Sequence, residues 1–488
     1  MRKTSFIRKE DSSLGGKGSM TNQSIDWKAE AAKRKDDFLE DLFTILKIDS
    51  VRDDSKATAE APVGPGPKEA LEAFLAIGER DGFKAENFDN WAGHIEYGDG
   101  DEIMGVLAHV DVVPTGTGWE TDPFEPVIKD GRLYARGSSD DKGPGMAAYY
   151  AIKMIKDLGL PVSKKIRFIL GTDEESEWKG IKHYLETQPE PDFGFSPDAM
   201  FPIINGEKGN VSAELSFKGN ATGGTHKLVE FESGLRANMV PQDAVAVIES
   251  ENPSELENGF QDYLSGQPVT GDLSVDGNLV TVTVVGKAAH GSTPAKGINA
   301  GTHLARFLSE FNFGGDAKDF IQVAALYLHD DPSGSKLGVA HTDEVMGELT
   351  SNTGVFKFNA DKGGQMTVNM RYPQGTSEEI IGKQIKDKVS QYAVEVNLPE
   401  GKVPHYVPGN DPLVQTLLDV YERQTGFEPS EQVIGGGTYG RLMKRGVAYG
   451  AMFPNSIDTM HQANEFMAVD DLMNAMAIYA EAIYELVK

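Results

Sequence analysis

A histidine and an aspartate close a short apolar run in the segment MGVLAHVD, residues 104–111. The run is typical of a buried strand, and side chains two positions apart on a strand lie on the same face. His109 and Asp111 should therefore stand together, so that the carboxylate accepts a proton from one imidazole nitrogen and leaves the other free for a metal. An ordinary strand-end histidine satisfied by its neighbour would give the same pattern.

Further polar residues close the later apolar strands. Asp140 and Asp141 follow the hairpin expected over 126–135, and Glu174 and Glu175 follow the strand expected over 165–171. Asp198 follows the strand at 193–195, and His461 precedes the C-terminal helix. Solvated turns and helix starts also attract acids. In an α/β domain, however, ligands bind outside the carboxyl ends of parallel strands, so these groups should converge.

The elements that must hold these groups follow two different patterns. Apolar strands alternate with amphipathic helices up to about residue 208 and again from about 404. Helices are expected over 26–51, 68–80, 144–158, 178–186, 413–425 and 469–487, and a further buried strand is expected over 447–453. Between these parts, alternating strands dominate. We expect an α/β, doubly wound domain from 20–208 and 404–488, with an inserted α+β domain over 209–403. Residues 1–19 are expected to form a disordered leader.

Composition limits the partners and the compartment. The formal net charge of −28 argues against nucleic acid or an anionic membrane as a partner. The chain has no cysteine, which excludes disulfides, a thiolate nucleophile and a cysteine-type zinc site. No run approaches the ~18 apolar residues of a membrane span, and the first residues lack the apolar core of a secretory signal. We therefore expect a cytoplasmic protein.

Together, the ordered motifs resemble those of the M20 metallopeptidase family, and most of all the carnosinase-like, PepV-type dipeptidases of lactic-acid bacteria. The resemblance runs from about Ile25 to the C-terminus and includes GRLYARGSSDDKGP, LGTDEESEWKG, FSPDA, NGEKG, RYPQGT, HYVPGNDP and IGGGTYGR. It implies that the doubly wound domain is a zinc-peptidase catalytic domain, that the inserted α+β domain is its lid, and that the protein is a dinuclear, metal-dependent dipeptidase. The substrate would be a small unblocked dipeptide with a free N-terminus and a free C-terminal carboxylate.

The resemblance implies that Asp140 bridges two divalent cations, because cations about 3.5–4 Å apart need a shared anion between them. One cation would also take His109 and Asp198, and the other would take Glu175 and His461. Such a nitrogen and oxygen set suits Zn²⁺, and Mn²⁺ or Co²⁺ are also possible.

Other motif residues resemble the catalytic and substrate-binding groups of the family. Glu174 would be the general base that serves a metal-bound hydroxide, and Asp111 would orient the first metal-ligating histidine. His290 would stabilise the oxyanion from the lid. The groups that bind the substrate carboxylate would be Asn238, Arg371, Gly437 and Thr438.

Two alternatives stay open from the residues. Another M20 activity, such as an N-acyl-amino-acid deacylase or a tripeptidase, would use the same metals, and an acidic metal-binding protein would need only the clustered carboxylates. The 195-residue lid favours the dipeptidase, since it is longer than the dimerisation domain of dimeric relatives. So long a lid brings His290 back to its own chain and predicts a monomer. The resemblance also predicts a cis peptide bond between Asp140 and Asp141.

Overall fold

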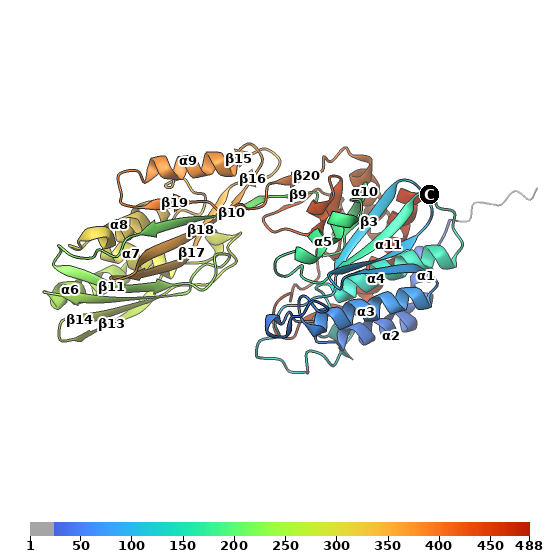
Figure 1. Cartoon of the computed structure of the whole chain (residues 1–488), viewed down its shortest axis with the longest axis horizontal. Helices are drawn as coiled ribbons and strands as arrows, with labels where there is room; N and C mark the ends of the chain where they lie inside the picture. Colours follow the sequence, from blue (N-terminus) through green and yellow to red (C-terminus); the bar gives the residue numbers. More distant parts are fainter. Residues whose placement is uncertain (1–23) are drawn as a thin grey trace, which may run out of the picture.

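The computed structural model describes residues 24–488, so the leader expected over 1–19 lies outside the described residues. The chain forms two bodies side by side along its long axis, joined by a few extended segments (Figure 1). Each body has its own hydrophobic core. The first and last parts of the chain build one body, and the middle part builds the other.

The first body is built on a six-stranded sheet in the order β1-β2-β6-β3-β7-β22. The strands β6, β3, β7 and β22 run parallel, whereas β1 and β2 pair antiparallel at one edge. Their bounds are β1 Lys84–Phe88, β2 Ala92–Tyr97, β3 Ile103–His109, β6 Lys165–Gly171, β7 Phe193–Ser196 and β22 Gly446–Ala448. Strand β3 is buried along its whole length, as its continuous apolar run predicts for a central parallel strand.

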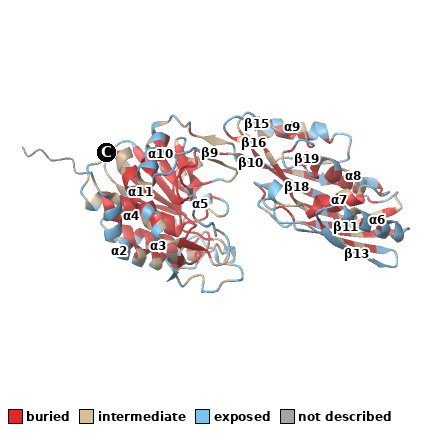
Figure 2. Ribbon diagram, turned by 180° about the vertical axis from the view of Figure 1, so that it is seen from behind, coloured by how far each residue is buried: buried red, intermediate tan, exposed pale blue. Residues whose placement is uncertain are grey.

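Helices cover both faces of this sheet. Val106 and Ala108 of β3 join the core of the first face, whereas Leu107 joins the cluster on the second. The first face carries α1 Trp27–Lys33, α2 Lys35–Leu46, α3 Pro65–Arg80, α4 Lys142–Asp157, α10 Pro412–Thr425 and α11 Val469–Val487, and the second carries α5 Lys179–Thr187 and the short η4 Tyr439–Leu442. Figure 2 shows the buried sheet between these layers. This arrangement is the doubly wound fold that the sequence predicts.

The second body is an eight-stranded, fully antiparallel sheet in the order β13-β14-β12-β11-β17-β18-β10-β19. Its strands are β10 Gly209–Phe217, β11 His226–Ser233, β12 Asp243–Ser250, β13 Thr270–Asp276, β14 Leu279–Val285, β17 Thr350–Asn359, β18 Gly363–Tyr372 and β19 Glu395–Asn397. Burial alternates along β10, so one face of the sheet lies against the helices. These helices are α6 Pro253–Ser265, α7 Ala300–Leu308, α8 Gly315–Val323 and α9 Glu378–Lys388, with the short π-helical η3 Ala324–Leu328.

One of the small sheets lies where the chain passes between the two bodies. Strand β9, Gly206–Glu207, pairs with β20, His405–Tyr406, and with β21, Val433–Ile434, so the chain enters and leaves the second body through one three-stranded sheet (Figure 1). A second three-stranded sheet consists of β24 Phe466–Ala468, β5 Arg132–Tyr134 and β4 Val127–Lys129. Two pairs of short strands complete the fold: β23 Ala451–Met452 with β8 Ala199–Met200, and β15 Thr342–Asp343 with β16 Gly347–Glu348.

Two predicted elements differ from the structure. The single helix expected over 26–51 is two helices, because the chain breaks at Arg34 between α1 and α2. The single strand expected over 447–453 is divided between β22 and β23, which belong to different sheets, because Gly450 takes a left-handed φ of 69° between them. Within residues 24–488, no helix combines the length and apolar character needed to cross a bilayer.

Candidate active site

Three parallel strands deliver the predicted site residues to one edge of the sheet. β3 ends at His109, β6 ends shortly before Glu174 and Glu175, and β7 ends shortly before Asp198. Because parallel strands share the direction of their carboxyl ends, these side chains meet. The loop before α4 adds Asp140, and the loop between β23 and β24 adds His461.

His109 lies at the centre of the cluster. Its Nδ1 is 2.9 Å from the carbonyl oxygen of Asp111 and 3.2 Å from the carboxylate Oδ1 of the same residue. Its Nε2 is 3.1 Å from Oδ1 of Asp140 and 3.3 Å from Oδ2 of Asp198. A proton on Nδ1 is thus held by Asp111, and Nε2 faces the acids as a metal ligand must.

Asp140 lies between two imidazoles and presents one oxygen to each. Its Oδ2 is 3.0 Å from Nε2 of His461, which is also 3.2 Å from Oε1 of Glu175. The five predicted ligands therefore form two groups that meet at Asp140. This is the geometry that a bridging carboxylate needs.

The buried carboxylates of the site repel one another. Burial and the nearby charge of Asp198 raise the pKa of Glu174 well above its usual value, while burial and Asp140 raise the pKa of Glu175 to about 8. Hydrogen bonds with Asp140 and Glu175 raise the pKa of His461 to about 11. Divalent cations among these groups would relieve the repulsion and remove the need for a charged histidine, so the donor set fits metal ions.

Asp141 belongs to the same cluster, although its sequence context assigned it no role. Two sets of side chains each place their possible metal-ligand atoms within 4.8 Å of one another. One set is His109, Asp141 and Asp198, and the other is His109, Asp140 and Glu175. The Oδ2 of Asp141 accepts the backbone N–H of His109 at 3.3 Å, and its buried Oδ1 has no hydrogen-bond partner within residues 24–488. The predicted cis bond between Asp140 and Asp141 is confirmed.

The loop that carries Asp140 is held by a buried residue, Glu465, that no sequence motif indicates. Glu465 accepts the backbone N–H groups of Gly137, Ser139 and Asp140 at 3.0, 2.9 and 3.2 Å. It also pairs with the guanidinium of Arg136 at 2.9 Å. No local signal reveals this contact, since the two segments are more than 320 residues apart in the chain.

His290 reaches the catalytic body from the lid of the same chain. A methyl group placed on Gly435 would lie 3.0 Å from Cβ of Ser292, so the loop of His290 contacts the loop after β21. Burial lowers the pKa of His290, and the positive charges of Arg371 and His461 lower it further. His290 therefore lies near enough to Arg371 and His461 for their charges to act on its ring.

The predicted substrate-binding residues lie at this junction. Arg371, on β18, donates through Nη1 to the carbonyl of Gly435 and through Nε to Asn369. Asn238 lies beside the histidine loop, where its carbonyl accepts the N–H of Gly291 at 2.7 Å.

The Gly435–Thr438 loop is expected to offer donors to the substrate carboxylate, but those of Thr438 are already engaged. Both the N–H and the hydroxyl of Thr438 are taken by the buried carboxylate of Glu207, at 3.0 and 2.6 Å. Thr438 offers no free donor in this conformation, and Gly437 lies next to Arg441. The substrate-binding roles of Thr438 and Gly437 stay predictions.

The profile of Peptidase family M20/M25/M40 matches residues 105–485. The chain belongs to this family. Over 465 residues it is 45% identical to the Beta-Ala-Xaa dipeptidase of Lactobacillus delbrueckii subsp. lactis, an alignment that covers 95% of this chain and 99% of that relative. The M20 membership predicted from the motifs is confirmed.

Solved structures agree with the fold of this M20 peptidase. Human carnosine dipeptidase 1 superposes with a TM-score of 0.56 at 14% identity and covers 94% of this chain and 98% of its own. Aminoacylhistidine dipeptidase from Vibrio alginolyticus gives 0.56 at 14% identity, with 92% and 96% covered. At this identity the likeness concerns the fold alone, and it confirms the predicted α/β catalytic domain with its inserted α+β lid.

We predict that Glu465→Gln weakens Zn²⁺ binding by this M20 peptidase about 10–100-fold, the usual loss when a residue that orients a ligand is changed. The amide replaces a charge that three backbone N–H groups and Arg136 now share. Competition with a chromophoric chelator measures the affinity. The matched control is Glu481→Gln, which breaks another arginine pair between α10 and α11, away from the site. Equal affinity in the Glu465 variant and the wild type would contradict the prediction.

Proposed function

We propose that the chain is a metal-dependent dipeptidase that hydrolyses unblocked dipeptides, including those with an N-terminal β-alanine. The observation that carries the proposal is the cluster of acids and histidines at the carboxyl ends of the parallel strands, together with a lid histidine, His290, on which the charges of both Arg371 and His461 act. The 45% identity to a Beta-Ala-Xaa dipeptidase over nearly the whole chain supports the substrate class.

The metal ligands we propose are His109, Asp140, Glu175, Asp198 and His461. Their nitrogen and oxygen donors suit Zn²⁺, with Mn²⁺ and Co²⁺ as alternatives. Two bound cations would polarise the scissile carbonyl and lower the pKa of the attacking water. The cluster also carries an excess of negative charge, which favours a substrate with a free ammonium group.

Glu174 is the proposed general base. Its backbone N–H donates to Oδ1 of Asp111 at 3.2 Å, and its Oε2 lies 3.8 Å from Nε2 of His109, farther than the ligand carboxylates. Its buried carboxylate has a raised pKa, which suits a group that takes a proton from water and returns it to the leaving amine.

His290 is the proposed oxyanion donor. The backbone N–H of Ser292 donates to Nδ1 of His290 at 3.1 Å, so Nδ1 is the acceptor and the proton lies on Nε2. A neutral imidazole held in this way can donate from Nε2 to the developing oxyanion. The lowered pKa of His290 keeps the ring neutral.

Arg371 is the proposed clamp for the C-terminal carboxylate, assisted by Asn238 and the loop of Gly437 and Thr438. Burial and Arg441 lower the pKa of Arg371, and a free carboxylate would supply the missing counter-charge. An opposed cationic clamp and acidic cluster would select for short peptides with both ends free.

We also propose that the enzyme acts as a monomer with a lid over residues 209–403, since β10 and β20 lie at these limits. The eight-stranded lid sheet is complete within one chain. The absence of cysteine fits a cytoplasmic enzyme.

The first test compares substrates and metal loading. We expect the Zn²⁺-loaded protein to hydrolyse a free dipeptide and a β-alanyl dipeptide, and chelation to abolish both activities until metal is restored. An acetyl cap on the same dipeptide should abolish hydrolysis. Faster hydrolysis of N-acyl amino acids or tripeptides would replace the proposal by the other M20 activities, and no hydrolysis at all would favour a metal-binding protein.

The second prediction concerns Glu174→Gln. The amide cannot accept a proton, so turnover should fall by about 10²–10⁴ while metal content stays unchanged. Kinetics and metal analysis on one preparation measure both quantities. Glu177→Gln serves as the control, because Glu177 lies nearby but is exposed and pairs with Arg52. Loss of a metal from the Glu174 variant would make it a ligand instead.

The third prediction concerns His290→Ala. Losing one oxyanion donor should lower kcat by about 10²–10³ with the metals retained, whereas His183→Ala, a surface histidine, should leave kcat unchanged. A mixture of the His290→Ala and Glu174→Gln proteins should stay inactive, because each chain supplies its own histidine. Recovery of activity in the mixture would show that His290 acts between chains.

A further inference from the structure

Two buried histidines, His303 and His329, lie in contact inside the lid and belong to none of the sequence motifs of the active site. His303 is on α7 and His329 directly follows η3. Their exposed fractions are 3% and 8%, and their ring centroids are 4.5 Å apart with the planes at 80°. Buried imidazole nitrogens are polar, so each needs a hydrogen-bond partner or a metal ion.

One nitrogen of each ring is already held. The Nδ1 of His303 is 2.8 Å from the hydroxyl of Tyr263, and the Nδ1 of His329 is 3.1 Å from the hydroxyl of Thr302. Over the described part of the chain, neither Nε2 has a hydrogen bond. An imidazole oriented through one nitrogen presents the other as a ligand, as histidines do in metal sites.

A carboxylate completes the group. Oδ2 of Asp330 is 3.5 Å from Nε2 of His329, and ligand atoms of His303, His329 and Asp330 all lie within 4.8 Å of one another. The neighbouring Asp331 is not available, because it accepts the backbone N–H groups of residues 336 and 337.

The charge state of the group suits a ligand set. Burial lowers the pKa of His303, and burial lowers the pKa of His329 to about 4, so both rings are neutral. The positive neighbours are already engaged: Arg306 bonds to Glu310, and Lys336 donates to the carbonyl of His329.

We propose that His303, His329 and Asp330 bind a divalent transition-metal ion, separate from the cluster at the strand ends. Two imidazole nitrogens and one carboxylate oxygen, with a position left for water, form a donor set that suits Zn²⁺. The ion would link α7 to the segment after η3 and so tie two helical parts of the lid together.

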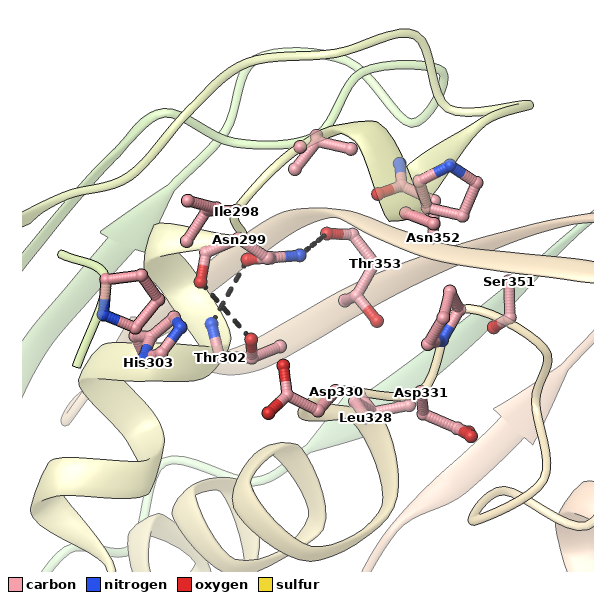
Figure 3. A pocket seen from close by; sticks show the side chains of 16 residues that line it. Ile298, Asn299, Thr302, His303, Leu328, Asp330, Asp331, Ser351, Asn352 and Thr353 are labelled. Carbon is pink, nitrogen blue, oxygen red and sulfur yellow. Dashed lines mark hydrogen bonds between the residues drawn. The ribbon is translucent and has the colours of Figure 1, made fainter. Parts of the chain in front are cut away.

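The proposed site opens on a cavity of about 370 Å³ (Figure 3). His303, Thr302 and Asp330 lie toward one end of the view and Asn352 toward the other. Asn352 donates to the carbonyls of Ala237 and Met239, on either side of Asn238. The cavity gives an ion access from solvent, and Asn352 on its wall joins it to the segment that carries Asn238.

Metal counting on the full chain tests the proposal. After chelation and titration with Zn²⁺, we expect the wild type to bind one equivalent more than the His303→Gln/His329→Gln double variant. His226→Gln is the matched control: this buried lid histidine has both nitrogens hydrogen-bonded, to Ser250 and Glu255, and its loss should not change the count. Equal counts in the wild type and the double variant would overturn the proposal.

A second variant avoids the buried core. Asp330 is exposed, so Asp330→Asn should fold normally and should weaken one Zn²⁺ equivalent by at least about tenfold. Unchanged affinity for every equivalent in a folded Asp330→Asn protein would overturn the proposal. Peptide hydrolysis does not enter either measurement, and the difference in count does not depend on how many ions the strand-end cluster takes. The lid site and the proposed dipeptidase activity are therefore tested independently.

Discussion

Mutual repulsion among buried carboxylates is the constraint on which the catalytic body depends. Asp140, Asp141, Glu174, Glu175 and Asp198 gather at the carboxyl ends of parallel strands, where burial and their own charges raise the pKa values of most of them. Carboxylates buried without compensation are costly, so the cluster needs positive charge. Two imidazoles and divalent metal ions are groups that can supply it.

The surroundings of the cluster keep its geometry fixed despite that repulsion. Asp111 holds His109 and also accepts the N–H groups of Glu174 and Glu175, so one carboxylate ties the end of β3 to the loop after β6. Glu465 does the same for the loop of Asp140. Each support is a charged acceptor saturated by backbone donors or by a cation. Such supports set the orientation of a ligand before any metal arrives.

The lid adds groups that the acid cluster lacks. A sheet of small strands passes the chain into the lid beside the site, and β18 and the loop after β14 return Arg371 and His290 to the junction. The proposed clamp Arg371 and the proposed oxyanion donor His290 thus come from one body, and the acids come from the other. Lys402 strengthens the junction, because its ammonium lies 3.4 Å from the centre of the Trp178 ring near the point where the chain leaves the lid. Relative movement of the two bodies would change the distance between the clamp and the acids.

The sequence by itself determined the family, the doubly wound sheet, the inserted lid and the acids and histidines of the site. These features are local: an apolar strand, the polar residue that closes it and the spacing between motifs are all read within short segments. Parallel strands then bring the segments together, because their carboxyl ends share one edge of the sheet.

Tertiary structure decided what depends on contacts between distant segments. Glu465 supports Asp140 across more than 320 residues, Glu207 occupies the donors of Thr438, and Asp141 accepts the backbone N–H of His109. The pairing of His303 with His329 likewise depends on the packing of α7 against η3. A buried acceptor or a pair of distant histidines leaves no periodic pattern in the sequence. Their partners come from segments far apart in the chain, and only folding brings them close.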